Sequence, residues 1–167
     1  LQADGYLTAG LDSSSIQKDS LNRENTLTAY IHKGELYTWA KLHSINVDEE
    51  ALSSSGFREK MYRNRPFRYT QTRRMMRKVI TYYENNGYPF VSLSFDSLKT
   101  GSTHIEAGLK VNKGELFHVD SVTIRGTARI TPRYLYNYIG VKPGDVYNEA
   151  VMRQISTRMK ELPFLTE

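Results

Sequence analysis

The stretch Lys33-Gly34-Glu35-Leu36-Tyr37 occurs a second time, almost unchanged, as Lys113-Gly114-Glu115-Leu116-Phe117. Apolar and polar residues alternate before each copy, over 27–32 and 107–112, which is the pattern of half-buried β-strands. After each copy, apolar residues follow at the same spacing. The sequence therefore predicts an internal structural repeat.

A second pair of landmarks, Gly5-Tyr6 and Gly87-Tyr88, recurs at nearly the same interval. A period of about 80 residues is that of a small domain rather than of a solenoid repeat. We therefore expect tandem domains joined by very short Lys-Gly-Glu links, which restrict their relative orientations. The expected boundaries are a β-hairpin of a first domain at 1–34, a complete domain at 35–113 and the first part of a third domain at 114–167.

Composition narrows the class of protein. With 39% hydrophobic residues in 167, the chain can build one or two modest cores. No apolar run approaches the roughly 20 residues that a membrane-spanning helix needs, and no signal segment opens the chain. Cysteine is absent, which excludes disulfides and thiolate chemistry and leaves the redox compartment open.

Positive charge is concentrated in one window. Residues 58–78 hold nine basic side chains and one acidic side chain, a charge of +8, so the rest of the chain carries −3. The cations expected to form a basic patch are Arg63, Arg65, Arg68, Arg73, Arg74, Arg77 and Lys78.

The first two domains are expected to contribute the following elements. Strands at 7–12 and 26–33 flank a polar loop at 13–25, and such a hairpin alone is only marginally stable. The complete domain has the predicted order strand (35–45), helix (48–56), helix (72–86), strand (90–96) and strand (103–112), with a turn at 99–101. The residues expected on the inner face of the longer helix are Thr72, Met76, Val79, Ile80 and Tyr83.

The third domain repeats this beginning with a predicted strand at 117–125. Thr131-Pro132 is typical of a helix start and Gly140 of its end, and Pro143-Gly144 predicts a type II turn. A second helix follows, capped by Asn148. Its expected inner face consists of Val151, Ile155, Met159 and Leu162.

This order of elements resembles the polypeptide-transport-associated (POTRA) domain. The resemblance rests on the Gly-Tyr after the second helix, the Lys-Gly-Glu at the end of the domain, Ile124-Arg125-Gly126, and the stretch Val141 to Asn148 in the third domain. The middle domain departs from the pattern at 65–69, where cations replace Gly-Asp. The implied fold class is α+β, each domain being β-α-α-β-β with two helices on a three-stranded sheet.

Tandem POTRA domains are similar to the periplasmic part of BamA-like factors, which assemble outer-membrane proteins. The resemblance implies a place at the periplasmic face of a Gram-negative outer membrane and a C-terminal β-barrel that this chain does not include. It also implies that unfolded outer-membrane proteins and accessory lipoproteins are the partners. Two-partner secretion transporters carry similar domains and remain an alternative.

In a sheet of this kind, the strand that enters the final hairpin can have its other side free, and BamA-like relatives are similar in presenting it. An open edge offers backbone groups to any extended chain. The expected client-binding edge strand runs from Tyr88 to Asp96. Its named positions are Tyr88, Phe90, Ser92, Ser94 and Asp96.

No pattern in the sequence indicates catalysis. A phosphate-binding glycine loop, a nucleophile elbow and paired carboxylates on one helix face are all missing. His104 and Glu106 share one strand face and could touch a metal, but without a third ligand a solvated face is the better interpretation. We expect no enzyme activity and no cofactor.

The basic patch has three interpretations. It can solubilise the protein, or it can bind anionic headgroups or acidic partner surfaces. It can also bind RNA, because Arg and Tyr side chains are interleaved in this window. RNP and GxxG motifs are absent, so we expect no nucleic acid. A further expectation concerns this chain alone: its hairpin at 6–33 and its β-α-α part at 117–165 are complementary, so that copies could associate head-to-tail or by swapping.

Overall fold

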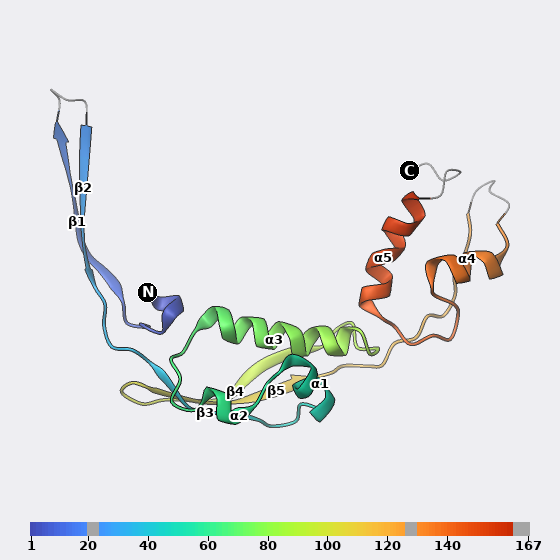
Figure 1. Ribbon diagram of the computed structural model, residues 1–167, viewed down its shortest axis with the longest axis horizontal. Coiled ribbons are helices and arrows are strands. Elements are labelled where there is room, and N and C mark those ends of the chain that lie inside the picture. Colours follow the sequence, from blue (N-terminus) through green and yellow to red (C-terminus); the bar gives the residue numbers. More distant parts are fainter. Residues whose placement is uncertain (20–23, 126–129, 162–167) are drawn as a thin grey trace. The chain divides into compact units, whose positions relative to one another are not determined.

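The computed structural model describes residues 1–19, 24–125 and 130–161, and the predicted α+β class is confirmed (Figure 1). The chain divides into two compact units, one of 1–45, 57–75 and 95–109 and one of 46–56, 76–94 and 110–167. In chain order the elements are the 3-10 turn η1 (Gln2–Asp4), strands β1 (Gly10–Asp19), β2 (Glu24–His32) and β3 (Thr38–Ser44), helices α1 (Glu49–Ser55), α2 (Glu59–Tyr62) and α3 (Tyr69–Glu84), strands β4 (Ser92–Thr100) and β5 (His104–Asn112), and helices α4 (Pro132–Ile139) and α5 (Glu149–Lys160).

Strands β1 and β2 of the first unit form an antiparallel ribbon. The predicted strand at 7–12 overlaps β1, which begins only at Gly10, and the predicted loop at 13–25 was wrong over 13–19, because β1 continues to Asp19 through the polar stretch. Residues 20–23 of that predicted loop lie outside the described residues. A two-stranded ladder is built from backbone groups, so polar side chains can occupy it as readily as apolar ones. The register shifts between Leu11 and Ser13, which marks a β-bulge.

The second sheet has three strands in the order β3-β5-β4. β3 pairs in parallel with β5, an arrangement that requires a long crossover, and helices α1 to α3 lie on that connection. In the first unit, Trp39, Leu42 and Leu109 are almost completely buried, and the rings of Phe67 and Phe95 pack on Trp39 with centroids 5.2 and 5.8 Å away. This aromatic cluster is the core of the first unit.

The helices begin and end close to the predicted places. Gly56 ends α1 in the left-handed conformation, with φ of 76°. The one-turn helix α2 was not predicted, and α3 starts at Tyr69 rather than at 72. The deeply buried side chains of α3 are Thr72, Met75, Val79 and Tyr83, whereas Met76 and Ile80, which the sequence placed on the inner face, are half-buried.

An asparagine extends the parallel pairing in the second unit. The side chain of Asn46 donates to the carbonyl of Val111 and accepts from its N–H, both at 2.8 Å. The amide group therefore takes the place of one more strand residue after β3 has ended at Ser44.

The last part of the second unit confirms most of the local predictions. Asn148 caps α5 by accepting from Val151 N–H, and Pro132 occupies the first turn of α4. A small core forms around Leu135 and Ile139. Partly buried side chains packed on it include Val119, Val122, Val151, Ile155 and Met159.

The predicted strand at 117–125 was wrong, since this stretch shows only an isolated bridge between His118 and Val146. A strand needs a neighbour, and in the part of the chain that the structure describes none lies beside it as β5 lies beside β3. Gly126 and Leu162 lie outside the described residues.

The repeat is visible in backbone hydrogen bonds. Asn64 N–H donates to Trp39 O at 2.7 Å, and at the equivalent place in the next repeat Gly144 N–H donates to Val119 O at the same distance. Asn64 and Gly144 both have positive φ, 58° and 90°. Asparagine tolerates this conformation better than most residues, so the loop keeps its geometry although the sequence departs from the Pro-Gly-Asp pattern.

The buried sheet is expected to dominate stability. Leu109→Ala should lower the free energy of unfolding by about 3 kcal/mol, because this side chain is fully buried and its loss leaves a cavity. Ile80→Ala should cost clearly less, and the exposed Leu98→Ala should cost under about 0.5 kcal/mol. Urea unfolding followed by the fluorescence of the single tryptophan measures all three, and equal losses would contradict this core.

One face of the β1–β2 ribbon is apolar and exposed, so we expect the protein to self-associate as its concentration rises. The residues on this face, all more than half exposed, are Leu11, Ile16, Leu27 and Ile31. We propose that this face covers the α4–α5 core of another copy. Light scattering should show a mass that rises with protein concentration, and Ile16→Lys with Leu27→Lys should restore the monomer mass. A constant monomer mass in the parent would exclude the proposal.

Candidate protein-binding edge and basic surface

Strand β4 lies at one edge of the three-stranded sheet, with only β5 beside it in the strand order. The edge strand was predicted at Tyr88 to Asp96, whereas β4 covers Ser92–Thr100. Tyr88 and Phe90 therefore precede the strand, because the chain is still turning there: Tyr88 N–H donates to Tyr83 O, and Val91 N–H donates to Tyr88 O.

The opposite edge, β3, is covered by the loop that follows α2. Trp39 N–H donates to Arg65 O at 2.9 Å, and Phe67 N–H donates to Tyr37 O at 2.8 Å. Within the described residues, Ser92 and Ser94 of β4 have no comparable backbone bonds to a covering loop. The two edges of one sheet thus differ in the access they give to another chain.

Side chains on β4 alternate as the sequence predicted. Ser92 and Ser94 are exposed, while Leu93 and Phe95 are half-buried. The alternation ends at Asp96, which the sequence placed on the exposed face but which is half-buried and accepts from Ser97 N–H at 2.7 Å. Ser97 has a φ of 53°, which is unusual for a residue other than glycine. A regular ladder with an added chain is therefore restricted to the first part of β4.

All seven cations of the basic patch are exposed. Arg73, Arg74, Arg77 and Lys78 lie on α3 between its buried positions, and the other three belong to the stretch after α2. No ion pair with a carboxylate involves any of the seven across the described ranges. Their charge is available to an external anion.

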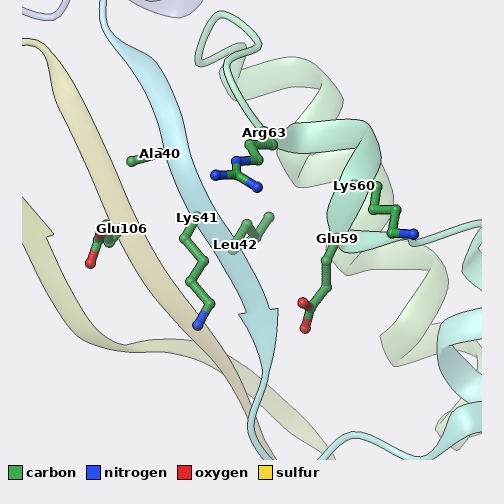
Figure 2. Close-up of a pocket in the computed structure, with 7 residues that line it drawn as sticks. All are labelled: Ala40, Lys41, Leu42, Glu59, Lys60, Arg63 and Glu106. Atoms are coloured by element: carbon green, nitrogen blue, oxygen red, sulfur yellow. The ribbon is translucent and has the colours of Figure 1, made fainter.

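A hollow of about 420 Å³ lies between β3, β5 and α2 (Figure 2). Lys41 and Glu106 are partners in the parallel register and line it from the two strands. Glu59 and Arg63 line it from the side of α2, and Glu59 accepts from Ser44 N–H. Three cations and two carboxylates line this hollow, so both signs of charge are present and nothing in it selects one kind of ion.

His104 does not join a metal site. A hydrogen bond of 2.9 Å links its Nδ1 to Thr38 Oγ1. Over 1–19, 24–125 and 130–161, no three His, Cys, Asp or Glu side chains gather closely enough to hold a metal ion. Among the helices that are described, none is long and apolar enough to cross a membrane.

The two landmark motifs of the sequence meet in space. The ammonium group of Lys33 lies 4.2 Å from the ring centroid of Tyr6, and that of Lys113 lies 5.9 Å from Tyr88. Such contacts are cation–π interactions worth about 0.5–1 kcal/mol at exposed sites. The sequence shows the spacing of these motifs but not that they touch.

Lys113 also binds Asp48, with Nζ and Oδ2 2.6 Å apart. This explains why Asp48, although it precedes α1 as predicted, makes no side-chain cap. The hydrogen bond from Lys113 holds the pKa of Asp48 below its usual value. The pair therefore contributes stability above the unfolded pKa of about 3.9 and loses it as the pH falls through the lower folded pKa.

The chain is similar to known proteins both in one stretch of its sequence and in its fold. Residues 117–165 match the POTRA family, described as surface antigen variable number repeat. No curated protein sequence matches the chain. POTRA domains 3–5 of BamA from Haemophilus influenzae have a similar structure, with a TM-score of 0.59 and 16% identity over 97% of this chain and 65% of that one. The chain therefore spans less than two thirds of that structure.

Two further structures match less well. BamA from Haemophilus ducreyi lacking POTRA domains 1–3 has a TM-score of 0.46 and 13% identity, over 66% of this chain and 20% of that one. The N-terminal domain of Omp85 from Thermosynechococcus elongatus has a TM-score of 0.35 and 14% identity, over 99% of this chain and 69% of that one.

The match at 117–165 is to the same family, POTRA, that the sequence was expected to resemble. The fold of the chain is similar to that of POTRA domains 3–5 of BamA.

Gly87 offers a test of the contact between repeats. It has φ of 95°, and a Cβ there would lie 2.3 Å from Leu116 Cδ1 and 2.8 Å from Val146 Cγ1. Gly87→Ala should therefore cost about 1–2 kcal/mol for its positive φ, and more than Gly114→Ala, because the side chains of Leu116 and Val146 must also shift. Gly114→Ala has a positive φ but no neighbour within 4 Å and should cost about 1 kcal/mol. Equal losses in urea unfolding would contradict this packing.

Proposed function

We propose that this chain is the periplasmic POTRA region of an outer-membrane β-barrel assembly factor. In this proposal it receives extended segments of unfolded outer-membrane proteins by strand addition to β4. The fold similarity to BamA POTRA domains 3–5 supports the class, and the position of β4 at a sheet edge supports the mode of binding. The edge position of β4 is the observation on which the proposal chiefly rests.

Strand addition suits a receptor for many sequences. The backbone N–H and C=O groups of an edge strand can pair with any extended chain, whatever its side chains. Soluble proteins commonly block such edges with lysine, proline or a bulge. Ser92 and Ser94 supply neither charge nor proline, and the irregularity at Ser97 comes only after them.

The wider setting belongs to the same proposal. In this proposal the hairpin at 1–34 is the last part of one POTRA domain, 35–113 is a complete domain, and 114–167 is the first part of a third, with a C-terminal barrel elsewhere in the whole protein. Accessory lipoproteins dock on the domains, and no chemical step takes place. The basic patch serves this docking, since its arginine side chains can form bidentate hydrogen bonds with carboxylates of a partner.

Photo-crosslinking tests strand addition. Benzoylphenylalanine placed at Ser94 should capture a peptide taken from an outer-membrane β-strand, because the paired chain would lie about 5 Å away. The same probe at Glu106, which is exposed on the central strand β5, is the matched control. Capture as strong at Glu106 as at Ser94 would contradict addition at the β4 edge.

A salt series tests the RNA alternative. We expect no retention of single-stranded RNA in filter binding, even at about 50 mM salt, if the basic patch recognises acidic protein surfaces. RNA binding would be favoured if the logarithm of the binding constant fell linearly with the logarithm of the salt concentration, with a slope of about −0.7 for each phosphate contact. Arg73→Gln with Arg74→Gln should leave the crosslinking at Ser94 unchanged.

A further inference from the structure

Four large apolar side chains gather around Gly87 and stay accessible. The exposed fractions are 74% for Phe90, 49% for Leu116, 36% for Phe117 and 47% for Val146. Leu116 and Val146 both lie beside the position that a Cβ on Gly87 would occupy, and the rings of Phe90 and Phe117 meet edge-on with centroids 5.3 Å apart. These four residues, all in the second unit, form what we call the apolar shelf.

Backbone hydrogen bonds hold the shelf in place. Phe117 N–H donates to Gly87 O at 2.8 Å, and Tyr147 N–H donates to Phe117 O at 2.9 Å. Three segments that are distant in sequence are thereby fixed to one another. A preformed surface of this kind loses little conformational entropy when it binds.

The repeat itself does not require the shelf. The same backbone bond occurs one repeat earlier, where Tyr37 N–H donates to Gly5 O at 2.8 Å. At that earlier site, the residues that correspond in sequence to the shelf are Thr8, Leu36, Tyr37 and Pro66. Thr8 and Pro66 stand where the shelf has Phe90 and Val146, and of the four corresponding residues only Leu36, at 37%, is among the exposed large hydrophobic residues, so the earlier site presents a smaller exposed apolar surface.

The shelf adjoins the open end of β4. Phe90 lies in the turn that precedes Ser92, the first residue of β4, by two positions. A segment paired with Ser92 and Ser94 that continues past the start of β4 therefore comes close to Phe90, the most exposed member of the shelf. Backbone pairing does not depend on the side chains of the added segment, whereas an apolar surface beside the pairing strand favours apolar side chains.

We propose that the apolar shelf binds one large apolar or aromatic side chain of the extended segment that adds to β4, and so selects among client segments. This inference rests on the proposed strand addition. It defines the preferred client as an extended segment with an apolar residue two to four positions beyond its paired part. Burial of such a side chain corresponds to a preference of about tenfold or more.

The test compares two labelled peptides of about nine residues with alternating Thr and Val. One peptide has Phe at both termini and the other has Ser at both termini. The variable residue therefore reaches the shelf whether the peptide pairs parallel or antiparallel to β4. Fluorescence anisotropy measures the affinity of each peptide for three proteins, which are the parent chain, the Phe90→Ser variant and the Val146→Ser variant. The quantity compared is the ratio of the two affinities on each protein. Tyr69→Ser, which removes another exposed aromatic ring, is the matched control.

The parent should favour the Phe peptide about tenfold, Tyr69→Ser should keep that ratio, and both shelf variants should bring it close to one. Circular dichroism checks that each variant is folded. A ratio that stays at about tenfold in folded Phe90→Ser and Val146→Ser, while Ser94 still crosslinks both peptides, overturns the shelf but not strand addition. Loss of crosslinking at Ser94 with both peptides overturns strand addition and the shelf together.

Discussion

The hydrogen bond from Phe117 N–H to Gly87 O joins the end of one helix–turn segment to the first residues of the next repeat. Its counterpart, from Tyr37 N–H to Gly5 O, joins the previous pair in the same way. Both acceptors are glycines with positive φ, 95° and 105°, and side chains or carbonyl groups crowd the space that a Cβ would need. Both the backbone conformation and the crowding therefore favour glycine at these two positions.

The same loop geometry decides which sheet edge is accessible. After α2, residues 64–67 bond to β3 and close that edge, and residues 144–147 bond in the same manner to 117–119. Closure of one edge by the chain itself leaves β4 as the other boundary of the sheet. The open edge strand is thus specified by topology rather than by any motif within it, which is compatible with the proposed recognition of many client sequences.

Specific recognition would then come from surfaces beside the edge. Backbone pairing is insensitive to side chains, so discrimination between partners needs charge or apolar contacts. The basic patch and the apolar shelf are of these two kinds, and they occupy different parts of the chain. Charge acts over a Debye length of about 8 Å at physiological salt, whereas the shelf acts only on contact.

The sequence by itself determined what is local or periodic. The internal repeat, the glycines with positive φ and the caps of α4 and α5 follow from residue type and spacing, because each depends on neighbours within a few positions or on a recurring pattern. Only the tertiary structure decided the length of β1, the single bridge at His118 and the pairing of Asp48 with Lys113. These depend on which distant backbone or charge lies within reach, and distance across the fold is not encoded in spacing along the chain.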